Sequence, residues 1–126
     1  MNHDDLYHEQ VLEELRHPRH HGVLLNPTHS ANTGNASCGD TVRVTLVVTD
    51  GKIAEVGWEG EGCAISTAAM SLISDTIIGK TQEAVAQLGK QDILTLLGLD
   101  TISISRLQCA QVGLNAVKQA LAEPTK

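Results

Sequence analysis

Four side chains of this sequence have types and surroundings that suit metal chemistry: Cys38, Asp40, Cys63 and Cys109. Three thiolates are soft ligands and one carboxylate is a harder ligand. A set of this kind suits tetrahedral zinc or, with bridging sulfides, an iron-sulfur cluster. Three cysteines are an odd number without a compact disulfide spacing, so in a reducing compartment we expect thiols that are free, metal-bound or reactive.

Glycines flank two of these cysteines. Cys38 is followed by Gly39, and Gly60-Glu61-Gly62 precedes Cys63, so the backbone can turn sharply or be approached closely at both places. An extended Cys38-Gly39-Asp40 segment would project the thiol and the carboxylate to the same side. The cysteines form no compact Cys-x-x-Cys motif, however, and a lone cysteine is commonly a small buried apolar residue. The residues alone therefore leave a ligand set and buried core thiols as alternatives.

Other polar residues have two interpretations each. The six histidines all precede Asn32, and the His20-His21 pair suits either a metal site or a solvated loop. The lack of helical or strand spacing among the histidines favours the loop. Asp40 by itself can also cap a turn. Arg106 precedes Cys109 by three residues and either steadies a nearby thiolate or persulfide by its charge or faces solvent before the helix.

Length and composition limit the class of protein. With 126 residues and 41% hydrophobic content, the chain is expected to form one domain, residues 1–126, around one core. Its net charge of −6, with scattered basic residues and 2% aromatic content, disfavours nucleic acid and anionic membranes as partners. The first residues do not resemble a signal peptide, and no apolar run approaches the roughly 20 residues of a membrane span. We expect a cytoplasmic protein.

The middle of the chain predicts a β-hairpin. Val42, Val44, Leu46 and Val48 alternate with outward positions, and Asp50-Gly51 supplies a turn before a second strand that continues to Trp58. The preceding stretch, Asn26–Asn35, is polar and contains Pro27 and Gly34, which predicts a loop with room for a short edge strand.

Apolar residues at helical spacing predict the remaining elements. The expected helices cover Asp4–Arg16, the segment from Cys63 to Gly79, Thr81–Leu88, Asp92–Leu97, and a last helix that follows the β-branched run Thr101–Ile104 and begins close to Cys109. Each cysteine then lies at a junction of elements, and such junctions can converge in space. At a helix N-terminus, free N–H groups and the helix dipole would lower the pKa of the Cys63 and Cys109 thiols.

Taken together, these motifs resemble a known family, the U-type iron-sulfur cluster assembly proteins, which comprises IscU, SufU and the N-terminal domain of NifU. The resemblance covers nearly the whole chain. It rests on Leu6-Tyr7 and Val11-Leu12, His17-Pro18-Arg19-His20-His21-Gly22, Asn35-Ala36-Ser37-Cys38-Gly39-Asp40, Gly60-Glu61-Gly62-Cys63-Ala64-Ile65-Ser66, and Arg106-Leu107-Gln108-Cys109-Ala110.

The resemblance implies an α+β fold of the SufE/IscU-like type, with a small antiparallel β-sheet packed against four or five helices. It implies that Cys38, Cys63 and Cys109 are the three family cysteines and Asp40 the family aspartate. It also implies a function: the protein receives sulfur as a persulfide from a PLP-dependent cysteine desulfurase. It then assembles a transient [2Fe-2S] cluster for acceptor or carrier proteins, or passes the sulfur onward.

Two departures from the IscU pattern and one from the SufU pattern refine the expectation. Gln108 stands where IscU-type members carry a histidine, and Asp100–Ser105 replaces their Leu-Pro-Pro-Val-Lys segment, so docking of a dedicated Hsp70-type chaperone is not implied. The site is closest to that of SufU-type members, which bind zinc through three cysteines and an aspartate. The interval from Cys63 to Cys109 is nevertheless too short for the SufU insertion. A zinc-dependent sulfurtransferase without a stable cluster is therefore the alternative function.

Overall fold

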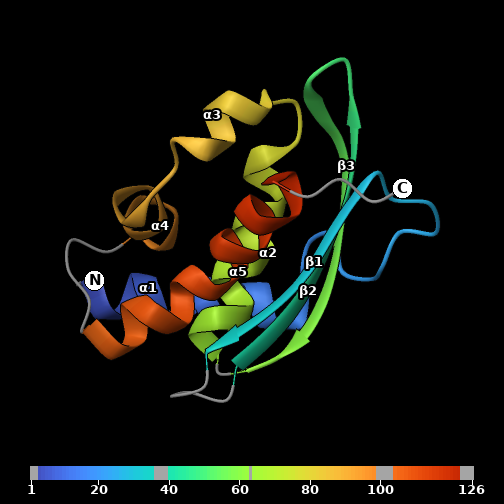
Figure 1. Cartoon of the computed structure of the whole chain (residues 1–126). Helices are drawn as coiled ribbons and strands as arrows, with labels where there is room; N and C mark the ends of the chain where they lie inside the picture. The colour runs from blue at the N-terminus through green and yellow to red at the C-terminus, as the bar shows by residue number, and fades with distance from the viewer. Residues whose placement is uncertain (1–2, 36–39, 63, 99–103, 123–126) are drawn as a thin grey trace.

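The computed structural model describes residues 3–35, 40–62, 64–98 and 104–122. Within these ranges, a three-stranded antiparallel sheet of order β1-β2-β3 packs against five helices. The elements in chain order are α1 (His3–Arg16), β1 (His29–Asn35), β2 (Asp40–Thr49), β3 (Lys52–Glu61), α2 (Ala64–Ile77), α3 (Gln82–Ala86), α4 (Lys90–Leu97) and α5 (Ile104–Ala122). Figure 1 shows the helices on one side of the sheet, and this arrangement confirms the predicted α+β fold.

The predicted hairpin is formed by β2 and β3. Asp50 and Gly51 both adopt positive φ, 54° and 77°, as a tight two-residue hairpin turn requires, and Thr49 pairs with Lys52 across it. The alternating apolar residues point to the helices and are buried. These core residues of the hairpin are Val42, Val44, Leu46, Val56 and Trp58.

β1 is longer than the sequence suggested. The polar stretch Asn26–Asn35 was expected to be mainly loop, but seven of its residues pair along β2, from His29 opposite Leu46 to Asn35 opposite Asp40. Its sequence lacks the apolar alternation that predicts a strand. The free edge of β2 and the packing of α5 impose the strand instead, which is the usual way that tertiary context overrides β propensity.

α2 and α5 cover the inner face of the sheet. α5 packs on β1 and β2, while α2 lies between α5 and α1 and also contacts β3. α2 has nine buried residues, most of them apolar side chains that recur at helical spacing. In the part of the chain that the structure describes, no helix combines the length and apolar content that a membrane span needs.

The positions of the remaining helices agree with local sequence signals, such as capping residues at their N-termini. α1 and α2 lie where they were expected, and α3 begins after Thr81, whose Oγ1 accepts a hydrogen bond from the Ala84 N–H at 3.1 Å. α4 begins at Lys90, two residues before the predicted start. Asp92 is not its first residue but lies in its first turn and accepts the Gly89 N–H at 2.8 Å.

Residues 22–28, which we call the strap, cross the outer face of the sheet. The Gly22 N–H donates to the Trp58 carbonyl at 2.7 Å on the β3 edge, and the Thr28 N–H donates to the Leu46 carbonyl at 2.8 Å on the other side of β2. Between them, the Leu24 N–H donates to Thr45 Oγ1 at 3.0 Å. Thr45 points outward yet is fully buried, so the strap shields the outer face there. Figure 1 shows this loop on the side away from the helices.

Gly57 makes room for the strap. A Cβ atom at this position would overlap the Gly22 carbonyl oxygen and lie 3.1 Å from the Leu24 amide nitrogen. We predict that Gly57→Ala lowers the free energy of unfolding by about 1–3 kcal/mol, since backbone atoms cannot move aside cheaply. Urea denaturation measures this change. Glu55→Ala, at an exposed position of the same strand, should change the free energy by less than about 0.5 kcal/mol. Equal stability of the Gly57→Ala protein and the wild type would contradict the packing described.

Candidate functional site

The segments that carry the predicted ligands meet at one end of the sheet. Asn35 and Asp40 are opposite each other in the register of β1 and β2, so the connection that contains Cys38 begins and ends there. Thr41, next to Asp40, is opposite Glu61 at the end of β3. Adjacent strands are about 5 Å apart. Cys38 and Cys63 themselves lie outside the described residues, and Asp40 is placed by its backbone register.

α2 starts from the same end of the sheet. Gly62 follows β3, and Ala64 is the first residue of α2, so the expectation that a helix begins directly after Cys63 is confirmed. Figure 1 shows the end of β1, the start of β2, the end of β3 and the start of α2 close together at the bottom of the view. The hairpin of β2 and β3 thus returns the chain from Asp40, at the start of β2, to the same end of the sheet at Gly62.

Cys109 differs from its predicted position. α5 begins at Ile104, so Cys109 lies in the second turn of the helix and not at its N-terminus. The run Thr101–Ile104 was expected to precede the helix. Its last residue is helical, and Thr101–Ser103 lie outside the described residues. The helix dipole acts mainly within the first turn, so the argument that it stabilises a Cys109 thiolate is wrong. Cys109 is 6% exposed and disulfide-bonded in this structure, which differs from the expected free or metal-bound thiol. It can act as a ligand only after this bond is reduced to the thiol.

A small cavity connects α5 to the strand ends. Its volume of about 10 Å³ is close to the size of a single water molecule. The lining residues are Thr41, Val42, Trp58, Gly60 and Glu61 of the hairpin, Ser66, Thr67 and Met70 of α2, and Val112 and Gly113 of α5. The cavity thus joins the turn of α5 that follows Cys109 to the first turns of α2, and both adjoin the strand end that begins at Asp40.

These positions are compatible with a shared ligand site. Within residues 3–35, 40–62, 64–98 and 104–122, no group of three or more His, Cys, Asp or Glu residues is arranged to hold a metal ion. The predicted set needs Cys38 and Cys63, which fall outside those ranges. What the structure does supply is a buried cysteine on a long helix, next to a strand end that begins with an aspartate. A thiol and a carboxylate so placed fit zinc or a cluster iron as donors.

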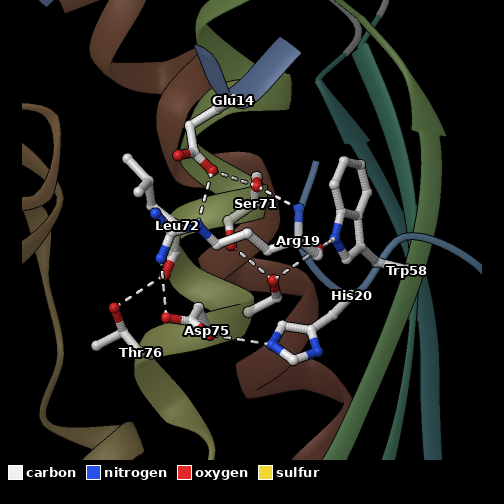
Figure 2. Close-up of polar contacts among 9 residues, drawn as sticks. Glu14, Arg19, His20, Trp58, Ser71, Leu72, Asp75 and Thr76 are labelled. Carbon is white, nitrogen blue, oxygen red and sulfur yellow. Dashed lines mark hydrogen bonds and ion pairs between the residues drawn. The ribbon is translucent and has the colours of Figure 1, made fainter. Parts of the chain in front are cut away.

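A hydrogen-bond network that the sequence analysis missed fastens the chain after α1 to α2 (Figure 2). The buried Glu14 carboxylate accepts the Ser71 hydroxyl at 2.6 Å, and its Oε1 lies 3.3 Å from Arg19 Nε. The Arg19 N–H donates to Ser71 Oγ at 2.8 Å, and the Arg19 carbonyl accepts the Trp58 indole N–H at 2.7 Å. Each buried oxygen of the Glu14 side chain therefore has a hydrogen-bond partner, as the burial of a carboxylate requires.

The predicted loop interpretation of the His20-His21 pair is confirmed, since both residues are exposed in the connection that follows α1, and each side chain also makes a contact there. His20 Nε2 lies 3.1 Å from Asp75 Oδ1, and the His21 ring packs edge-on against Trp58 with centroids 5.0 Å apart. His29 lies in β1, and its burial lowers its pKa. The hydrogen bond from His20, with further contributions from Arg19, lowers the pKa of the Asp75 carboxyl. The contacts of Asp75 can be followed in Figure 2.

The fold and the location of the candidate site define the class of this protein. It is a small α+β protein in which the ends of β1 and β3 and the starts of β2 and α2, which flank Cys38 and Cys63 in the sequence, adjoin one end of a three-stranded sheet. α5, which carries Cys109, packs on the same sheet. The chain belongs to the family described as the NifU-like N terminal domain, whose model matches residues 6–125.

The relatives of the chain have names of two kinds: iron-sulfur cluster assembly protein and zinc-dependent sulfurtransferase. The "Iron-sulfur cluster assembly scaffold protein IscU" of Streptococcus pyogenes serotype M1 is 29% identical, over 96% of this chain and 84% of its own length. The "Zinc-dependent sulfurtransferase SufU" of Bacillus subtilis is 28% identical, over 97% of this chain and 93% of its own. The "Iron-sulfur cluster assembly enzyme IscU" of Drosophila melanogaster is 31% identical, over 94% of this chain and 77% of its own.

Solved structures show the same fold. A crystal structure described as a hypothetical protein superposes with a TM-score of 0.80 at 29% identity and covers 95% of this chain and 99% of its own. The SUF-system scaffold protein of Fervidobacterium islandicum AW-1, described as putative in its published name, superposes with a TM-score of 0.77 at 24% identity, over 93% and 97% of the two chains. The likeness to this second structure concerns the fold alone.

The Asp75 contacts predict a pH dependence. Because the folded-state pKa of Asp75 lies below the ordinary value of 3.8, the carboxylate adds stability that is complete above about pH 4. This stability is lost as the pH falls through the lowered pKa. We predict that Asp75→Asn costs at most about 1 kcal/mol at pH 7, because Asp75 is half exposed. The cost should shrink as the pH falls below the ordinary aspartate pKa of 3.8.

Urea denaturation of both proteins at pH 7, 5 and 3 measures this difference. Glu55→Gln, on the exposed side of β3, is the matched carboxylate-to-amide control and should follow the wild type at every pH. A cost of Asp75→Asn that does not change between pH 7 and 3 would show that the charge of Asp75 contributes nothing.

Proposed function

We propose that this chain, as one domain over residues 1–126, is an iron-sulfur cluster assembly scaffold. It accepts sulfur from a cysteine desulfurase and assembles a transient [2Fe-2S] cluster for acceptor or carrier proteins. Membership in the NifU-like N terminal domain family supports the general role. The observation that carries the proposal is the arrangement of the elements that bear Cys38, Asp40, Cys63 and Cys109 around one end of the sheet.

The proposed ligands are the thiolates of Cys38, Cys63 and Cys109 and the carboxylate of Asp40. Gln108 precedes Cys109 in place of a histidine, which leaves Asp40 as the proposed oxygen donor. A carboxylate holds a cluster iron less firmly than a thiolate does. We infer that this weaker ligand favours release of the cluster to another protein, since the cluster is cargo and not a resident cofactor.

Sulfur enters by transfer between thiols. A thiolate of this chain attacks the terminal sulfur of the desulfurase persulfide, a new S–S bond forms, and the desulfurase thiolate leaves with the electron pair of the broken S–S bond. The sulfur is then carried on the scaffold as a persulfide. One S–S bond has formed and one has broken, so the total number of S–S bonds and of thiols is unchanged. Burial around Cys109 excludes water from part of the site and protects such a reactive group.

The second candidate is a zinc-dependent sulfurtransferase, which carries the persulfide and builds no stable cluster. Two observations favour it: the four donors suit tetrahedral zinc, and the chain is 28% identical to the Bacillus subtilis protein with that name over nearly its full length. In this role zinc would order the thiolates until one of them leaves the metal to accept sulfur.

We predict that anaerobic reconstitution of the scaffold with ferrous iron and sulfide yields a coloured protein with sulfide-to-iron charge-transfer absorption. Serine in place of Cys38, Cys63 or Cys109 should abolish this absorption, and Asp40→Ala should change its intensity and the rate of cluster loss. Glu61→Gln, which alters a carboxylate at the same end of the sheet outside the proposed donor set, is the control and should behave as the wild type.

Elemental analysis of the protein purified anaerobically separates the two candidates. Iron and acid-labile sulfide in equal amounts support the scaffold. One equivalent of zinc, strong stimulation of the desulfurase and a colourless protein after reconstitution would overturn the scaffold in favour of the sulfurtransferase. A protein without bound metal, whose three thiols resist alkylation until it unfolds, would contradict both functions.

A further inference from the structure

α2 and α5 approach each other most closely at Gly113. A Cβ atom at this position would lie 2.5 Å from Met70 Sδ, 3.2 Å from Met70 Cβ and 3.4 Å from Met70 Cα. The first distance is too short for a non-bonded contact between a carbon and a sulfur atom, and the second is tight. Met70 is only 1% exposed, so its sulfur can move only into the small cavity that Met70 lines, and rotation of the side chain does not move its Cβ atom. A glycine is needed here for space, and the backbone of α5 is ordinary helix.

This contact lies between the two helices that adjoin the proposed site. Gly113 follows Cys109 by one turn of α5, and residues four apart lie on the same face of a helix. Met70 lies two turns after Ala64, the residue that starts α2 directly after Cys63. Gly113 and Met70 also line the cavity that Ser66 and Thr67 share with the strand ends.

A displacement at this contact would reach the ligands. A helix is a rigid rod with a rise of about 1.5 Å per residue, so a shift of α5 at Gly113 moves Cys109, about 6 Å away, by a similar amount. An added methyl group would require the helices to separate by several tenths of an ångström up to about 1 Å. Metal-ligand distances tolerate about 0.2 Å. The displacement therefore exceeds what a bound metal can accept without losing a ligand or its geometry.

We propose that Gly113 and Met70 are positioning residues that set the distance between the Cys109-bearing helix and the Cys63-bearing end of α2. This inference rests on the proposed function, because it assumes that both cysteines bind the same zinc ion or cluster. It adds two residues that do not touch the metal and that act through the packing of the two helices.

The first test is zinc affinity, measured by competition with a chelator. Gly113→Ala should weaken binding by about 10-fold or more, the range found when residues that support metal ligands are altered. The absorption spectrum of the Co²⁺-loaded protein should change as well, because its intensity reports how close the site is to a tetrahedron. Val117→Ala is the matched control. It lies one turn further along α5, is fully buried, and removes core volume without changing the helix spacing.

A rescue experiment separates positioning from general loss of stability. Met70→Ala in the Gly113→Ala protein removes the 2.5 Å overlap and leaves the contacts with Cβ at 3.2 Å and Cα at 3.4 Å. Zinc affinity and the Co²⁺ spectrum should return towards those of the wild type, although the double variant loses core contacts of Met70 and is no more stable. If Gly113→Ala does not fold, Met70→Ala alone is compared with the double variant, which should fold and bind zinc more weakly than Met70→Ala.

Three outcomes would overturn the inference. They are zinc affinity of Gly113→Ala within about 2-fold of the wild type, an equal loss of affinity in Val117→Ala, and a double variant that binds no more tightly than Gly113→Ala. Failure of the proposed function looks different, because the wild-type protein itself would then bind neither zinc nor a reconstituted cluster.

Discussion

The packing of α2 against α5 is the constraint on which the rest of this structure depends. The proposed ligands come from three separate stretches of the chain, and local sequence brings none of these stretches together. The sheet aligns two of them through the register of β1, β2 and β3. The third arrives only because α5 lies across β1 and β2 while in close contact with α2 at Met70. In a site assembled in this way, the relative positions of the ligands are only as well defined as the packing of the helices.

α2 is held from its other side as well. Glu14 of α1 reaches Ser71, and Arg19 connects that pair to Trp58 of β3 and to Asp75 further along α2. The result is a polar layer between α1, α2 and the sheet edge, in which Glu14 and Ser71 are buried while Arg19 and Asp75 are about half exposed. Because a buried carboxylate is costly unless it is fully hydrogen-bonded, this layer tolerates few alternative arrangements. It therefore fixes the orientation of α2, whose first residue follows Cys63.

Much of the fold was predictable from the sequence, because its signals are local. The alternating valines and Asp50-Gly51 gave the hairpin, and the apolar spacing from Ile65 onwards gave α2. β1 was not predictable, since its residues are polar and the strand exists only because β2 offers a free edge. The start of α5 was missed for a related reason. β-branched residues before Cys109 favour extended backbone in isolation, whereas packing on the sheet makes Ile104 helical.

The candidate site was predictable in its residue types and less so in its environment. Cys109 is buried within a helix, so its surroundings differ from the electropositive helix end that its sequence position suggested. Cys38 and Cys63 lie outside the described residues, so the prediction for them can be compared only with the backbone segments beside them. The roles of Gly113 and Met70 had no sequence signal beyond a glycine within a helix, which costs stability unless a neighbour needs the space.

The path of the strap has a consequence for the order in which the chain folds. The β2–β3 hairpin has short-range contacts and a two-residue turn, so it can form early and on its own. β1 is joined to β2 by a connection that is also short in sequence, and Asn35 pairs with Asp40 across it, so this pairing is local as well. The strap makes the contacts that are more distant in sequence: residues 22–28 pass the β3 edge and lie over Gly57, and the Gly22 N–H donates to the Trp58 carbonyl. The strand pairings that frame the proposed site therefore depend on local contacts, whereas the cover over the outer face of the sheet depends on contacts that close a much longer loop.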